Sequence, residues 1–213
     1  MSNYQNTNLM ITIIDYGAGN LGSIQNMIRK IGFKSKISSN KEDILNAEKL
    51  ILPGVGSFDF GMNQLNKSGL IDILNLKVLE EKIPILGICL GVQLFTNQSE
   101  EGDLKGLSWF NAETVKFNFN ESNKLKIPHM GWNEVIKIKD SRLLEDMSLE
   151  SRYYFVHSYH LKCNDPKDAL LETNYGYNFV SAIEKNNIVG VQFHPEKSHK
   201  FGMEILYNFI QNY

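Results

Sequence analysis

The sequence predicts an α/β fold: a central, mostly parallel sheet flanked by helices, with additional antiparallel strands in the second half. Up to Glu100, short apolar runs alternate with segments that repeat apolar residues at helical spacing, as in parallel sheets covered on both faces. After Glu100, strand-like segments follow one another with few helices between them. With 213 residues, 42% of them hydrophobic and 22% charged, the chain is typical of a globular protein.

The first half is expected to alternate strands with helices. Asn20–Ile31 has apolar residues at helical spacing, Asn40 is a residue type that caps helices, and Pro53-Gly54 is expected to stop a strand. The expected strands are Met10–Tyr16, Lys34–Ser38, Lys49–Leu52 and Pro84–Ile88. The expected helices are Asn20–Ile31, Lys41–Ala47, Phe58–Leu65, Ile71–Glu81 and a helix from Leu90 to about Thr96.

The second half is expected to consist mainly of strands before a last helix, Lys200–Asn212. A hairpin is expected across Lys185–Asn187, which separates two apolar runs. The expected strands are Val115–Phe119, Trp132–Ile138, Tyr153–Tyr159, Ala169–Thr173, Phe179–Glu184 and Ile188–Phe193. Because no linker or repeat interrupts the chain, we expect one domain over residues 1–213, with residues 1–9 as a flexible N-terminal extension.

Composition excludes several classes of protein. The formal net charge of −2 gives no global attraction to nucleic acid or acidic membranes. Two cysteines are too few for a disulfide framework, and the polar N-terminus has no signal-peptide pattern. No apolar run reaches the roughly 18 residues that span a bilayer. We therefore expect a cytoplasmic protein. No metal site or cofactor is expected, because no His/Cys/Asp cluster has ligand spacing.

The segment Gly87-Ile88-Cys89-Leu90-Gly91 follows an expected strand and precedes an expected helix. This is the setting of a nucleophile elbow, in which small neighbours let the nucleophile project from a tight turn. The helix N-terminus favours a thiolate at Cys89 and directs the N–H of Leu90 toward a developing oxyanion. Taken alone, the pattern also fits a buried structural cysteine.

A candidate base and its orienting acid lie near the C-terminus, at His194 and Glu196. In an extended conformation, residues two apart point to the same side, and Pro195 is expected to fix the turn between them. Glu196 would hold the His194 ring while His194 accepts the thiol proton and later protonates the leaving amine.

Other histidines compete less well for the role of base. His157 lies in the strand-like segment Tyr154–Tyr159 without an acid two residues away, so we expect it to be a packing or interface histidine. His129, His160 and His199 have no acidic companion at a comparable spacing either.

A dinucleotide-binding protein is an alternative of a different class. Gly17–Gly22 (GAGNLG) matches the G-x-G-x-x-G fingerprint between a strand and a helix, and Glu42 and Asp43 follow at about the expected distance. Asn40 instead places both acids in a capped helix. The alternative also gives Cys89, His194 and Glu196 no common role.

Five segments together resemble the class I, triad-type glutamine amidotransferases, and more narrowly the glutaminase subunits of imidazole glycerol phosphate synthases. The resemblance runs from about Met10 to the C-terminus. The segments are DYGAGNLG at 15–22, PGVGSF at 53–58, GICLGVQ at 87–93, PHMGWN at 128–133 with YFVHSY at 154–159, and QFHPEKS at 192–198. One mild departure is Gly22, where many histidine-pathway members carry a basic residue.

The resemblance implies a role for each matching residue. It implies that Cys89 is the nucleophile, His194 the base and Glu196 its orienter. The amides of Val55 and Leu90 would form the oxyanion hole. Gly54, Gly56 and Gln93 would bind glutamine. The residues implied for the partner interface and ammonia gate are Asn20, His129, Trp132, Asn133, Tyr154 and Lys197.

The resemblance also implies the reaction and the partner. Glutamine would be hydrolysed to glutamate and ammonia, and the ammonia would pass to a barrel-shaped cyclase subunit in a heterodimer of histidine biosynthesis. Two alternatives stay open. One is a paralogue that supplies ammonia to a surface-sugar amidotransferase converting acetamido to acetamidino groups. The other is a non-enzymatic regulatory subunit, against which the intact Cys89, His194 and Glu196 argue.

Overall fold

The computed structural model describes residues 9–120 and 125–213. The expected N-terminal extension, residues 1–9, therefore lies outside the described residues except for Leu9. The described strands are β1 (Met10–Ile14), β2 (Lys34–Ser38), β3 (Lys49–Gly54), β4 (Ile85–Cys89), β5 (Gln98–Ser99), β6 (Ala112–Lys116), β7 (His129–Glu134), β8 (Ile136–Lys137), β9 (Arg152–His157), β10 (Tyr159–Cys163), β11 (Ala169–Asn174), β12 (Asn178–Lys185) and β13 (Ile188–Val191).

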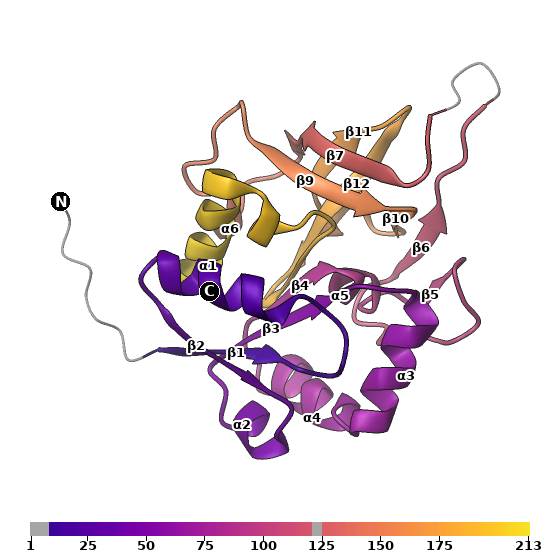
Figure 1. The fold of residues 1–213 in the computed structure, drawn as a ribbon. Helices are drawn as coiled ribbons and strands as arrows, with labels where there is room; N and C mark the ends of the chain where they lie inside the picture. The colour runs from indigo at the N-terminus through magenta and orange to yellow at the C-terminus, as the bar shows by residue number, and fades with distance from the viewer. Residues whose placement is uncertain (1–8, 121–124) are drawn as a thin grey trace.

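One large sheet connects the two halves of the chain, in the order β2-β1-β3-β4-β13-β12-β10-β6-β5. Strands β2, β1, β3, β4 and β13 pair in parallel. From β13 onward, β12, β10 and β6 pair antiparallel, and β11 and β8 extend this half. A separate antiparallel pair, β7 and β9, packs beside them (Figure 1). The predicted fold class is confirmed.

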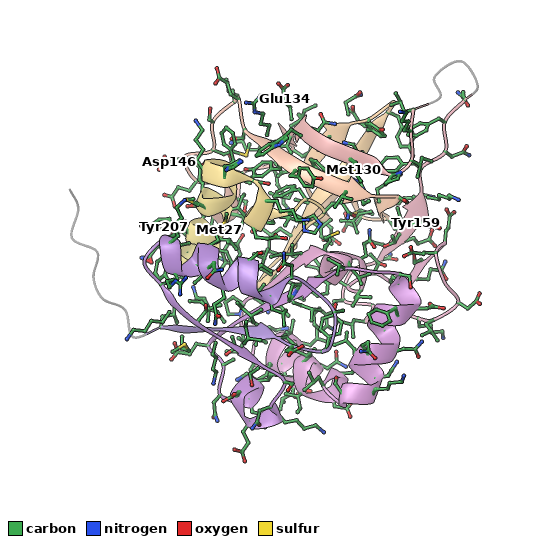
Figure 2. All side chains as sticks on the ribbon, viewed as in Figure 1. Met27, Met130, Glu134, Asp146, Tyr159 and Tyr207 are labelled. Atoms are coloured by element: carbon green, nitrogen blue, oxygen red, sulfur yellow. The ribbon has the colours of Figure 1, made fainter. Side chains whose placement is uncertain are left out.

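Helices cover both faces of the parallel half (Figure 1). The helices are α1 (Leu21–Lys30), α2 (Lys41–Leu45), α3 (Phe58–Ser68), α4 (Ile71–Asn75), α5 (Leu90–Gln93) and α6 (His199–Asn212). Helices α1 and α6 bury Ile28 and Phe209 in one apolar cluster, and α3 and α4 bury Phe58 and Leu74 in another. Side chains fill the space between the sheet and these helices (Figure 2). Among the described residues, no helix combines the length and apolarity needed to cross a bilayer.

The structure corrects several expected boundaries. Strand β3 is not stopped by Pro53 but continues through Gly54 beside β4. Pro53 lies beyond Ile51, the last residue of β3 that pairs with β1, so its missing N–H costs no bond to that neighbour. The expected helix over Ile71–Glu81 changes after Asn75 into a π-helical turn, η1 (Leu76–Glu80).

In the second half, the boundaries shift and one expected strand divides. Strand β6 starts earlier than expected, and the strand expected over Trp132–Ile138 divides into β7 and β8. The strand expected over Tyr153–Tyr159 ends at His157 as β9, so that β10 beyond Tyr159 was not predicted. The short strand β5 was not predicted. The hairpin between β12 and β13 is confirmed, with Lys185 opposite Ile188. In the first half, the helix after Cys89 ends at Gln93 rather than Thr96.

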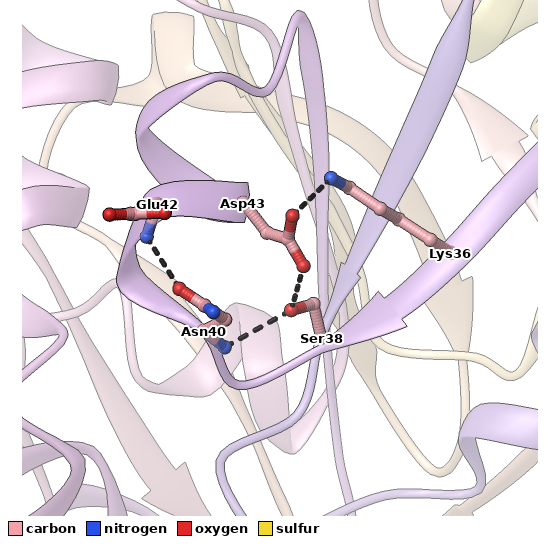
Figure 3. A network of polar contacts seen from close by, with 5 residues as sticks. All are labelled: Lys36, Ser38, Asn40, Glu42 and Asp43. Carbon is pink, nitrogen blue, oxygen red and sulfur yellow. Dashed lines mark hydrogen bonds and ion pairs between the residues drawn. The ribbon is translucent and has the colours of Figure 1, made fainter.

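The structure gives the acids of the dinucleotide pattern local roles, and Asn40 caps α2 as expected (Figure 3). The Asn40 side chain accepts a hydrogen bond from the Glu42 N–H at 2.8 Å. The Asp43 carboxylate accepts from Lys36 at 2.7 Å and from the Ser38 hydroxyl at 2.5 Å. Both acids thus belong to a capped helix, as the sequence favoured, and Asp43 links that helix to β2 through its side-chain bonds.

Candidate active site

Cys89 ends β4, and the next residue, Leu90, begins α5. The backbone of Cys89 has φ +54° and ψ −111°, a conformation that costs a residue with a side chain on the order of 1–3 kcal/mol. The flanking glycines are required by close packing. A Cβ on Gly87 would lie 2.6 Å from the Phe95 ring, and one on Gly91 would lie 1.9 Å from the Leu52 carbonyl oxygen. Buried neighbours therefore impose the sharp turn.

His194 and Glu196 form a direct pair. His194 Nδ1 lies 2.7 Å from Glu196 Oε1, and both side chains are almost fully buried. Because an ionised carboxylate only accepts hydrogen bonds, Nδ1 carries the proton and donates it. His194 comes close to Cys89 because β13 pairs with β4, with Val191 opposite Ile88.

The local route to this pair differs from the expectation. His194 lies three residues beyond β13, and Pro195 opens a 3-10 turn, η5 (Pro195–Lys197), rather than an extended segment. The backbone of His194 is fixed from two sides. Its N–H donates to the Tyr154 carbonyl at 2.9 Å, and its carbonyl accepts from the Ser198 hydroxyl at 2.7 Å.

The two neighbours of His194 control its protonation. Burial alone would lower the pKa of His194, but Cys89 and Glu196 together raise it to about 10. No hydrogen bond from His194 Nε2 to any described residue has normal geometry, although the Cys89 thiol is close enough to affect the pKa. With Nδ1 held by Glu196, Nε2 is the nitrogen left to exchange a proton with the sulfur.

A cavity of about 240 Å³ opens onto Cys89 and His194. It is lined by Val55, Gly56, Cys89, Leu90, Gln93, Glu101, Val156, His157, Ser158, Tyr159, His194 and Lys197. Gly54, expected to bind glutamine, is not among the lining residues. It is buried, and a Cβ there would lie 2.6 Å from the Tyr16 hydroxyl and 2.8 Å from Leu90 Cβ. Gly54 therefore permits close packing behind the elbow.

The sequence did not indicate Glu101, Ser158 and Tyr159 as lining residues. Glu101 follows β5, and one of its carboxylate oxygens accepts from the Phe58 N–H at 2.8 Å. That bond connects the N-terminus of α3 to the cavity. A lone acid after a short unpredicted strand carries no recognisable pattern, so only the fold could place it here.

The expected interface residues fall into two sets. Trp132, Tyr154 and Lys197 lie together. The ring centres of Trp132 and Tyr154 are 6.4 Å apart, and Lys197 Nζ lies 5.5 Å from the centre of the Tyr154 ring. Trp132 is 43% exposed, and Asn20 is exposed just before α1. His129 is only 3% exposed. It therefore lies behind the surface, among aromatic rings that exclude solvent, and its implied place at the interface or ammonia gate stays a prediction.

Three histidines, His129, His157 and His160, are buried among Phe117 and Phe179. Burial lowers the pKa of His129 to about 4, that of His157 to about 3, and that of His160 as well. No carboxylate contacts these rings in the described residues. His157 thus packs in this cluster, as expected, while one edge reaches the cavity.

Hydrogen bonds fix the tautomers of two of these rings. His157 Nδ1 lies 2.8 Å from the Tyr159 carbonyl, which can only accept, so Nδ1 carries the proton. His157 Nε2 must then accept from His129 Nδ1 at 3.0 Å. His129 Nε2 accepts in turn from the half-buried Asn133 amide at 3.2 Å. Both histidines are held neutral by this chain of donors and acceptors.

Several known proteins are similar to this chain in sequence or in fold. A family model described as glutamine amidotransferase class-I matches residues 12–212. A Methanococcus maripaludis protein named imidazole glycerol phosphate synthase subunit HisH 2 is 60% identical over 95% of this chain and 99% of its own length. A Pseudomonas aeruginosa protein of the same name is 48% identical over the same shares. The structure of PurLQS from Thermotoga maritima shares the fold, with a TM-score of 0.71 and 17% identity over 96% of this chain and 98% of that one.

Proposed function

The chain belongs to the class-I glutamine amidotransferase family, and we propose that it is the glutaminase subunit of an imidazole glycerol phosphate synthase. The near-complete coverage of two relatives with that name supports the assignment. The observation that carries the chemistry is the 2.7 Å bond between His194 and Glu196 beside a cysteine on a strained elbow. The large sheet joins both halves, which supports one glutamine amidotransferase domain.

In the proposed reaction, Cys89 gives its thiol proton to His194 Nε2, and the resulting thiolate attacks the side-chain amide carbon of glutamine. The C–N bond breaks as His194 Nε2 protonates the departing nitrogen, which leaves as ammonia and gives a glutamyl thioester. His194 then takes a proton from water, the resulting hydroxide adds to the thioester, and the C–S bond breaks to release glutamate. Glu196 holds the imidazole in the tautomer that both steps need.

Negative charge on the substrate oxygen requires donors near the sulfur. Leu90 is the first residue of α5, so its N–H lacks an intrahelical partner. Val55 lines the same cavity on the segment after β3. We assign the oxyanion to these two amides, each contributing on the order of 3 kcal/mol of transition-state stabilisation.

The cavity also offers groups for the amino-acid end of glutamine. Glu101 presents a carboxylate that suits the α-ammonium, and Gln93 and Gly56 line the wall beside the nucleophile. Gly56 has φ +108°, a conformation that favours glycine over other residues.

The ammonia acceptor would be a second subunit, because the described residues provide no second site of comparable chemistry. We propose a barrel-shaped cyclase that binds the side bearing Trp132, Tyr154 and Lys197. Ammonia is nucleophilic only while unprotonated, so direct transfer across this interface would preserve it. A cytoplasmic location is part of the proposal, because a free thiol nucleophile is kept reduced there.

The proposal is tested by measuring glutamate release from the purified chain, alone and with a cyclase subunit and its ribotide. We expect the partner to raise the rate and Cys89→Ala to abolish it. The matched control is Cys163→Ala, since Cys163 is the other free thiol and does not line the cavity. Cys89-dependent hydrolysis that ignores the cyclase would overturn the pathway assignment. Hydrolysis that survives Cys89→Ala would overturn the mechanism.

A further inference from the structure

Gln192 is a fully buried polar residue that the mechanism above does not use. It follows β13, and its N–H donates to the Ser181 carbonyl at 2.8 Å. Its side-chain Nε2 lies 3.8 Å from Cys89 Sγ, within the range of a weak N–H to sulfur hydrogen bond. Gln192 does not line the cavity, so it approaches the nucleophile from the protein side rather than from the substrate side.

The orientation of the Gln192 amide follows from its partners. The Tyr159 carbonyl can only accept, so the Gln93 atom 3.1 Å from it is the nitrogen. The same Gln93 nitrogen lies 3.1 Å from the Gln192 side chain, whose atom there must be the oxygen. The other end of the Gln192 amide, which faces the sulfur, is therefore the NH₂ group.

Besides the Gln192 N–H donor, several titratable or charged groups surround Cys89. The titratable or charged groups around the cavity and elbow are Tyr16, Glu101, His157, Tyr159, His194 and Lys197. Burial raises the pKa of Tyr16, and so does Cys89, so that hydroxyl stays neutral. His157 is also neutral, and His194 is placed to exchange a proton with the sulfur. Gln192 places its side-chain N–H 3.8 Å from the sulfur without lining the cavity, and it carries no charge of its own.

We propose that Gln192 is a positioning residue for the reaction, whose side-chain N–H holds Cys89 Sγ on the elbow and favours its thiolate. A hydrogen bond to the charged form of a group favours that form, and the thiolate is the reactive nucleophile. Gln93 holds the Gln192 amide in this orientation by donating a hydrogen bond to its oxygen. This inference rests on the proposed role of Cys89.

The test is the rate of Cys89 alkylation by iodoacetamide as a function of pH, in a Cys163→Ala background that leaves one thiol. Gln192→Glu keeps an acceptor for Gln93 but replaces the donor facing the sulfur with a carboxylate oxygen. Gln192→Met removes both polar ends with little change in size. We expect the midpoint of the profile to rise by about one pH unit in Gln192→Glu and by less in Gln192→Met. Gln211→Glu, an exposed change on α6, should leave it in place.

Glutaminase kinetics provide the second measurement. We expect kcat to fall about tenfold in Gln192→Met with KM nearly unchanged, because Gln192 lies outside the cavity. The proposal is overturned if folded Gln192→Met alkylates with the wild-type midpoint, even if kcat falls, because the residue would then be structural only. A shifted midpoint in a chain that never releases glutamate would support the contact and refute the proposed function instead.

Discussion

Histidines are buried in two places in this chain, and their neighbours give them opposite protonation behaviour. His194 contacts a carboxylate and a thiol, and its pKa is raised to about 10. His157 contacts a carbonyl and another neutral imidazole, and burial lowers its pKa to about 3. Burial disfavours the imidazolium in both places. In this chain the pKa is therefore raised at the buried histidine that has an anion beside it and lowered at the one that has only neutral neighbours.

This difference has opposite consequences for stability as pH changes. The unperturbed pKa of histidine is about 6.5. The raised pKa of His194 contributes stability that is fully present below that value and is lost as pH rises toward about 10. The lowered pKa of His157 works the other way, because the unfolded chain binds a proton that the folded chain refuses. Stability is then lost as pH falls from about 6.5 toward about 3.

The prediction with the largest expected effect removes the Glu196 carboxylate, the anion that contacts His194. Glu196→Gln keeps a side chain of the same shape but loses the charge that stabilises a cationic His194. We expect kcat for glutamine hydrolysis to fall on the order of 10³-fold, measured with saturating glutamine. Glu204→Gln is the matched control, since Glu204 is a partly buried acid on α6 outside the cavity. Wild-type kcat in Glu196→Gln would show that the carboxylate is dispensable.

The next test concerns the neutral cluster. His157→Gln can still donate to the Tyr159 carbonyl and accept from His129 but cannot become cationic. Between pH 6.5 and 4.5 we expect the unfolding free energy of the wild type to fall by roughly 2 kcal/mol more than that of the variant, since one pKa unit corresponds to about 1.4 kcal/mol. Urea unfolding at the two pH values measures this difference. Equal losses would mean that His157 does not control the acid sensitivity.

The prediction with the smallest expected effect concerns how the Cys89 thiol changes the pKa of His194. Cys89→Ala removes one of the two groups that raise the pKa of His194, while burial still opposes the charge. We expect that pKa to drop by about one unit, followed by NMR titration of ¹³C-labelled histidine side chains. If wild-type His194 titrated below pH 7, the difference drawn between His194 and His157 would be wrong.

The contrast also separates what the sequence predicts from what it does not. The alternation of apolar runs and helical segments predicts the parallel half well, because β1, β3, β4 and β13 are buried on both faces and read as largely apolar runs. Cys89, His194 and Glu196 were singled out because each stands in a short motif whose local backbone is constrained. The strand end expected at Pro53 was wrong, because the cost of the missing proline N–H depends on which strand lies beside β3 at that point.

Residues brought together by long-range pairing leave no local pattern. Glu101 reaches the cavity through β5, a two-residue strand, and His129 meets His157 only because β7 pairs with β9. Gln192 and Gln93 are 99 positions apart, yet their side chains bond. Spacing along the chain could not predict these contacts, because they depend on the register of strands far apart in sequence.

The strained backbone at Cys89 sets a trade-off for the evolution of this chain. A glycine at this position would relieve the positive φ at once and stabilise the fold, so selection for stability alone would remove the cysteine. Its presence in a turn that only tight packing can hold therefore fits a role in turnover better than a role in stability. If the chain took on a purely structural role, we expect the replacement of Cys89 to be the first change.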